Sequence, residues 1–74
     1  MKNLDYYMSL EYKVEIITIP EEVGGGVVAR IPKLGKYAFL GDGETIEEAM
    51  DNLNNIKREL FTSYLKLGIE IPEP

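Results

Sequence analysis

The sequence predicts an α+β domain in which a three-stranded antiparallel sheet is covered on one face by one long helix. Three observations predict it: early alternation of apolar and polar residues, glycine and proline between short apolar segments, and an apolar stripe of helical period in the last third. The 74 residues suit one domain with a small core. The expected order is β-β-β-α, and a short final strand over residues 69–71 stays open.

The first predicted strand rests on apolar side chains at every second position, namely Tyr6, Met8, Leu10, Tyr12, Val14 and Ile16. Strict alternation is typical of a strand with one buried face. After this run, Ile17 and Ile19 place apolar groups on the other face. We therefore predict a strand over residues 6–19, with residues 1–11 as an N-terminal extension that continues strand one. A short helix or a disordered segment is the alternative for residues 1–10, because Leu4, Met8 and Glu11 also fit helical spacing.

Glycine and proline divide the middle of the chain. Pro20 ends the first strand, and the three glycines at 24–26 predict a hairpin turn. A phosphate-binding loop is disfavoured, because no Lys-Ser/Thr pair and no helix follow these glycines. The second strand is predicted over residues 27–31, and the third over residues 37–40. We interpret residues 41–44 as the turn that closes the third strand.

The long helix is predicted over residues 45–67. Thr45 and Glu48 have the spacing of a capping box, and Gly68 stands where a C-terminal cap glycine belongs. Behind the cap, apolar residues recur every three or four positions, namely Ile46, Ala49, Met50, Leu53, Ile56, Leu60, Tyr64 and Leu67. This stripe is typical of a helix that packs one face on a core.

Composition narrows the function classes. The chain has no cysteine and no histidine, which excludes disulfides, thiolate and imidazole metal sites, and Cys–His or Ser–His–Asp catalysis. Thirteen acids against 8 bases give a net charge of −5, which disfavours direct nucleic-acid binding and favours a basic protein partner. We predict no catalytic residue, no metal ligand and no cofactor. We expect no membrane association and a cytoplasmic location, because no leader or spanning segment is visible.

Residues 25–34 have the sequence GGVVARIPKL, residues 41–49 GDGETIEEA and residues 68–74 GIEIPEP. In this order they resemble the GGYVAxVPxLPG segment, the xGDTxEEA helix entry and the GxxIPxP ending of the family of HicB-like antitoxins. They follow the family's order, and the resemblance covers residues 12–74. It implies a partial RNase H-like fold and binding to a small basic HicA-type toxin that cleaves mRNA. On this reading, residues 12–74 form a single HicB-like domain without a DNA-binding domain.

Two groups of residues are the candidate contact sites. The acids at the start of the long helix are a hypothetical docking patch for the basic toxin, namely Glu44, Glu47, Glu48 and Asp51. They also suit a helix N-terminus without any partner. We further predict a homodimer or larger even oligomer through an uncovered first strand, with contacts from Tyr6, Met8, Leu10, Ile17 and Ile19. The alternative function is a solitary oligomeric domain without a toxin, including one that binds a small molecule.

Overall fold

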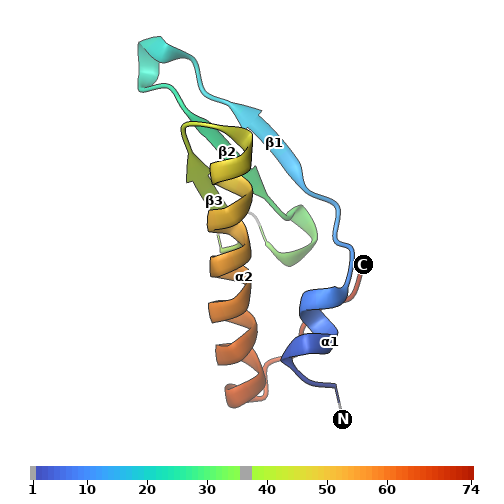
Figure 1. The fold of residues 1–74 in the computed structure, drawn as a ribbon. Coiled ribbons are helices and arrows are strands. Elements are labelled where there is room, and N and C mark those ends of the chain that lie inside the picture. The colour runs from blue at the N-terminus through green and yellow to red at the C-terminus, as the bar shows by residue number, and fades with distance from the viewer. Residues whose placement is uncertain (1, 36–37) are drawn as a thin grey trace.

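The computed structural model describes residues 2–35 and 38–74 and confirms the α+β class. A three-stranded antiparallel sheet is followed by one long helix that covers one of its faces (Figure 1). The helices and strands are α1 (Leu4–Ser9), β1 (Glu15–Thr18), β2 (Val27–Arg30), β3 (Leu40–Gly43) and α2 (Ile46–Leu67). Two short 3₁₀ helices, η1 (Glu21–Val23) and η2 (Pro32–Leu34), lie in the loops on either side of β2.

The sheet has the order β1-β2-β3, so β1 and β3 are its two edges. α2 packs against β3 and β2. Gly41 of β3 permits this close approach, because a Cβ atom at this position would overlap the backbone of Leu53 and Ala49 in α2. The helix therefore covers the β3 side of the sheet directly.

The core lies between the sheet and α2. Its largest fully buried side chains are Phe39, Phe61, Ile31 and Leu53. The rings of Phe39 and Phe61 have centroids 5.3 Å apart, and Tyr12 lies 6.1 Å from Phe61 on another side. This aromatic cluster sits under the second half of α2.

The N-terminal segment forms a helix, which corrects the prediction of a strand over residues 6–10 and of an extension continuing strand one. Asn3 caps α1 by accepting a hydrogen bond from the Tyr6 N–H at 3.0 Å. Leu4, Tyr7 and Met8, which share one face of a helix, pack against the core. The apolar residues of this short segment fit both the spacing of a helix and the alternation of a strand. The segment is helical because the helical face packs against α2 and the core. Strand one is therefore only Glu15–Thr18.

The third strand lies later than predicted. β3 is Leu40–Gly43, so residues 41–43, interpreted as a turn, belong to the sheet. Gly41 pairs with Ala29, and Gly43 pairs with Val27. Both positions require glycine because α2 lies against them. This requirement comes from a tertiary contact, so the neighbouring sequence does not indicate it. Residues 36 and 37, at the start of the predicted strand, lie outside the described residues.

α2 begins and ends as its capping signals predict. The Thr45 hydroxyl accepts the Glu48 N–H at 3.1 Å, and Gly68 caps the C-terminus with φ of 73°. The open alternative of a final strand over residues 69–71 is not realised. Instead, Ile69 donates its N–H to the Tyr64 carbonyl, and Ile71 is buried in the core.

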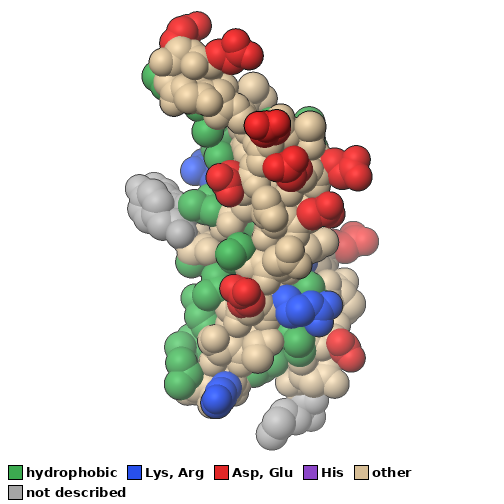
Figure 2. Space-filling model, turned by 60° about the vertical axis from the view of Figure 1, so that its left-hand side comes forward, with side chains coloured by type: hydrophobic (Ala, Val, Ile, Leu, Met, Phe, Trp, Pro, Cys, Tyr) green, Lys and Arg blue, Asp and Glu red, His purple; other side chains and the backbone are tan. Residues whose placement is uncertain are grey.

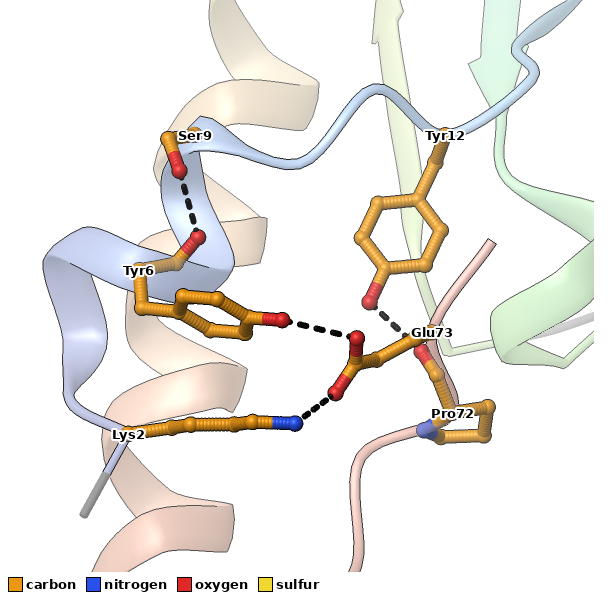
Figure 3. Close-up of polar contacts among 6 residues, drawn as sticks. All are labelled: Lys2, Tyr6, Ser9, Tyr12, Pro72 and Glu73. Atoms are coloured by element: carbon orange, nitrogen blue, oxygen red, sulfur yellow. Dashed lines mark hydrogen bonds and ion pairs between the residues drawn. The ribbon is translucent and has the colours of Figure 1, made fainter.

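The two terminal segments are joined by polar contacts that we call the Glu73 clasp (Figure 3). The Glu73 carboxylate accepts a hydrogen bond from Tyr6 Oη at 2.8 Å and pairs with the Lys2 ammonium. These contacts lower the pKa of Glu73 below its ordinary value and raise the pKa values of Lys2 and Tyr6. Beside them, Tyr12 Oη donates to the Pro72 carbonyl. The clasp fixes α1 next to the segment that follows α2.

Candidate functional site

An acidic hollow lies between the η1 loop and the beginning of α2. Its volume is about 770 Å³, and it is open to solvent. Four acidic residues line it, together with one asparagine and the glycines of two loops: Glu21, Asp42, Glu44, Glu48 and Asn52, with Gly24–Gly26 and Gly43. We call these residues the acidic hollow.

The glycine run shapes one wall of this hollow. Gly24, Gly25 and Gly26 have φ values of 117°, 73° and 99°, which L side chains rarely adopt. Gly26 then accepts the N–H of Ile19, which closes the hairpin. The run therefore confirms the hairpin prediction and carries Glu21 toward β3 and α2.

The opposite wall is formed by the junction of β3 with α2. The Asn52 side-chain amide donates to the backbone carbonyl of Asp42 and ties the first turns of α2 to the strand. Asp42 pairs with Val28 in the sheet register and joins this wall through its backbone carbonyl. The flanking Gly41 and Gly43 face α2, so the Asp42 side chain points to the other face of the sheet. Glu44 and Glu48 flank the Thr45 cap.

Only two of the four acids that were predicted from the sequence as a docking patch line the hollow. Glu44 and Glu48 line the hollow, whereas Glu47 and Asp51 are exposed on the first turns of α2 outside it. Sequence reasoning missed Glu21 and Asp42 as members of this site. In the sequence, Glu21 and Asp42 stand out only as acidic residues near glycines. They line one hollow only because the η1 loop, β3 and α2 lie next to one another in the folded chain.

The hollow belongs to a larger acidic surface. Figure 2 shows acidic side chains over the hairpin tip and along the first half of α2. Basic residues of α2 occur only in its second half, at Lys57, Arg58 and Lys66. Charges of one sign are thus gathered at one end of the molecule, where they create a negative electrostatic field.

An apolar side chain stands beside these acids. Val23, the last residue of η1, is 72% exposed at the hairpin tip, directly after Glu21 and Glu22. Among the described residues, no group of three or more acids is arranged to hold a metal ion.

The predicted oligomer contact residues are not brought together. Tyr6 and Met8 belong to α1, Leu10 follows it, and all three are partly buried within the chain. Ile17 lies on β1 with 38% of its surface exposed. Ile19 follows β1 and is partly buried. The proposed edge over residues 6–10 is therefore wrong, and only Ile17 and its neighbours remain on an open strand.

No known family model, characterised protein or solved structure matches this chain. Within the part of the chain that the structure describes, no helix has the length and apolar character needed to cross a membrane.

Proposed function

We propose that this chain is a HicB-like antitoxin domain that binds and neutralises a small basic HicA-type toxin, an mRNA-cleaving nuclease. The acidic hollow is the observation that carries the proposal, because Glu21 of the η1 loop lies there opposite Glu44 and Glu48 at the start of α2. The three segments that resemble the antitoxin family support the same function, and two of them, residues 25–34 and 41–49, contribute residues to the hollow.

The proposed mechanism is occlusion of the toxin's RNA-binding surface. A nuclease that binds RNA needs lysine and arginine side chains to contact phosphates. The carboxylates of the acidic hollow would take the place of those phosphates, with Val23 as an apolar contact at the rim. Opposite charges raise the association rate and make it depend on salt. Because the target of the toxin is mRNA, the proposal places both proteins in the cytoplasm.

The proposed fold relationship is a partial RNase H-like domain. Three antiparallel strands with a helix on one face agree with that description at the level of element order. The proposal assigns no catalytic role to the chain. Glu15, an acid inside a strand, is paired with Arg30 of the neighbouring strand at 2.6 Å. We expect no cleavage of an RNA–DNA hybrid with Mg²⁺ or Mn²⁺, and cleavage lost in Glu15→Gln would overturn this assignment.

Binding kinetics with a cognate HicA-type toxin test the site. Glu44→Lys with Glu48→Lys should slow association at least about tenfold at low salt and flatten its salt dependence. The matched control is Glu59→Lys with Glu70→Lys, two exposed acids that do not line the hollow. Both variants change the net charge equally. Equal slowing in the two variants would show that net charge, and not the hollow, directs binding.

The alternative function is a solitary oligomeric domain without a toxin. The open edge of β1 favours this alternative, because its Ile16 and Ile17 are 41% and 38% exposed. A chain that assembles with itself and shows no binding to any basic RNA-cleaving partner would support it. In that case the acidic hollow would serve as a site for a small cationic molecule.

A further inference from the structure

We propose that residues 2–10, which contain α1, and residues 69–74, which follow α2, open and close together as one lid over the aromatic cluster, while the sheet and α2 stay folded. The Glu73 clasp holds this lid shut. In the closed lid, the Tyr7 ring lies against the ring of Phe61, with centroids 5.9 Å apart. The lid is at the end of the molecule opposite the acidic hollow (Figure 1). Its opening therefore does not require a toxin bound at the hollow.

The helix α1 cannot hold its conformation alone. It has six residues, none of which is fully buried. Isolated helices shorter than about 12 residues are marginal in water, so α1 depends on its contacts with the rest of the chain. Apolar contacts with the core come from Leu4, Tyr7 and Met8. The Glu73 clasp adds polar contacts with the C-terminal segment.

The C-terminal segment depends in turn on residues near the N-terminus. It has no regular secondary structure and is held by a buried side chain and by polar contacts. Ile71 is 4% exposed, and the Pro72 carbonyl accepts a hydrogen bond from the Tyr12 hydroxyl. The Glu73 carboxylate then reaches across to α1 (Figure 3). Because each segment positions the other, loss of one should release both.

Most of the buried core lies outside the lid. Among the described residues, Ile71 is the one buried core residue that the lid contributes. The other buried residues lie on β2, on α2 and on the segments beside them. Opening free energies within one protein range from near zero to the global value, and regions with few buried contacts are at the low end. The lid should therefore open more readily than the sheet and α2 unfold.

An open groove of about 540 Å³ runs along the seam between the lid and α2. Its apolar walls are Leu4 and Tyr7 of α1, Tyr64 and Leu65 of α2, and Ile69 of the C-terminal segment. Side chains that line a groove lack packing partners on one side and lose the dispersion contacts that they would make in a filled core. The seam therefore holds the lid less tightly than a continuous core would.

Both parts of the lid are connected to the rest of the chain by segments that can act as hinges. Gly68 has a φ of 73°, and nothing lies within 4 Å of the position that an added Cβ would occupy. Residues 11–14, between α1 and β1, have no regular secondary structure. A few residues at the ends of elements are enough to absorb the φ and ψ changes of a hinge. Rotation at these two places moves the lid without breaking the strand pairs of the sheet.

Hydrogen exchange of the full chain, followed by NMR in increasing denaturant, tests whether the lid is a separate unit. The amides of Tyr7 and Leu10, which donate backbone hydrogen bonds, report on the lid. The amides of Ala29 in β2 and Leu53 in α2 report on the rest of the fold. We expect the two lid amides to have a lower opening free energy and a smaller dependence on denaturant. One shared opening free energy and slope for all four amides would overturn the proposal.

A matched pair of isoleucine variants tests whether the two parts of the lid are coupled. Ile71→Val removes one methyl group from the lid and should speed exchange of the Tyr7 and Leu10 amides roughly twofold to tenfold. Ile31→Val, the same change at a side chain 1% exposed outside the lid, should leave these two rates unchanged. Equal acceleration in both variants would mean that the chain opens only as a whole. Unchanged rates in Ile71→Val would mean that α1 opens by itself, and either result would overturn the lid.

The role of the clasp is tested by Glu73→Ala. The Tyr7 and Leu10 amides should exchange about threefold faster in this variant, a small effect because exposed ion pairs contribute little. The control Glu70→Ala removes an exposed acid outside the clasp and should leave both rates unchanged. Circular dichroism verifies that both variants are folded. Lid amides that exchange at the wild-type rate in folded Glu73→Ala would show that the clasp does not hold the lid shut.

Discussion

The two ends of this elongated molecule, 46 Å long and 19 Å across, are built in different ways. At one end, α1, the second half of α2 and the C-terminal segment enclose the aromatic cluster and are joined by the Glu73 clasp (Figures 1 and 3). At the other, the hairpin and the start of α2 gather carboxylates around an open hollow (Figure 2). The first end concentrates buried apolar contacts, and the second concentrates charge of one sign.

This difference indicates where the stability of the domain resides and where the proposed partner would bind. Charges of one sign repel each other and lower the stability of a compact state. A domain of this size has only about 3–5 kcal/mol of net stability, so the repulsion must be offset elsewhere. The aromatic cluster around Phe61 supplies this offset, because Tyr7, Tyr12 and Phe39 all lie against its ring. Substitutions should therefore affect folding at one end and partner binding at the other.

The largest effect is expected at Phe61. Phe61→Ala should cost about 3–5 kcal/mol, which is close to the whole stability of a small domain. Thermal unfolding followed by circular dichroism should show a chain that is largely unfolded at room temperature. The control Leu67→Ala, at a position 71% exposed on the same helix, should change the unfolding free energy by less than about 0.5 kcal/mol. Similar losses in both variants would contradict the assignment of the core.

The second largest effect on the unfolding free energy is expected at Gly41, and Gly24 serves as the comparison. Gly41→Ala should cost about 3 kcal/mol or more, because the added Cβ would overlap the backbone of α2. Gly24→Ala should cost about 1 kcal/mol, because its φ of 117° is strained for alanine although nothing lies near the added atom. Denaturant titration measures both. A larger loss for Gly24→Ala than for Gly41→Ala would mean that α2 does not lie directly on β3.

The Glu73 clasp predicts a pH dependence. The folded state lowers the pKa of Glu73 from 4.5, so the clasp contributes fully above pH 4.5 and is lost as the pH falls through the lowered value. The pKa values of Lys2 and Tyr6 are raised, so their contribution holds below their ordinary values of 10.5 and 10.0 and is lost as the pH rises through the raised ones.

Melting temperatures across this pH range measure the effect. The wild-type chain should lose melting temperature below pH 4.5 more steeply than Glu73→Gln, in which the carboxyl is absent. Glu70→Gln, a change at an exposed acid outside the clasp, is the matched control and should follow the wild type. Parallel curves for Glu73→Gln and the wild type would show that the clasp does not form in solution.

The smallest stability effect is expected in the acidic hollow. Glu21→Gln with Glu44→Gln removes two like charges and should leave the unfolding free energy unchanged or raised by up to about 0.5 kcal/mol. The same change should slow association with the toxin. A clear loss of stability would mean that these acids support the fold, and the comparison between the two ends would fail.

Much of the fold could be predicted from local signals. Thr45 and Gly68 mark the two ends of α2, and the glycine run marks the hairpin, because capping and positive φ depend on neighbouring residues. The conformation of α1 could not be predicted, since the spacing of Tyr6, Met8 and Leu10 fits strand alternation as well. Burial of Leu4 and Tyr7 against α2 decides it, and that contact joins distant parts of the chain.

The candidate site was likewise predictable only where local sequence signals mark it. Glu44 and Glu48 could be identified as an acidic helix start, whereas Asp42 was interpreted as part of a turn. Its position in β3 depends on the pairing with Val28 and on the approach of α2 to Gly41. Glu21 reaches the hollow only because the hairpin folds toward α2. Sites assembled from segments that meet in the tertiary structure are not encoded in any single local pattern.

Inhibition of the toxin's RNA cleavage by the purified chain tests the central claim most directly. The full chain is titrated into a cognate HicA-type toxin with a labelled RNA substrate. We predict that cleavage stops near one chain per toxin, and that Glu44→Lys with Glu48→Lys requires at least about tenfold more protein while Glu59→Lys with Glu70→Lys inhibits like the wild type. Undiminished cleavage in excess wild-type chain, or full inhibition by Glu44→Lys with Glu48→Lys, would contradict the account.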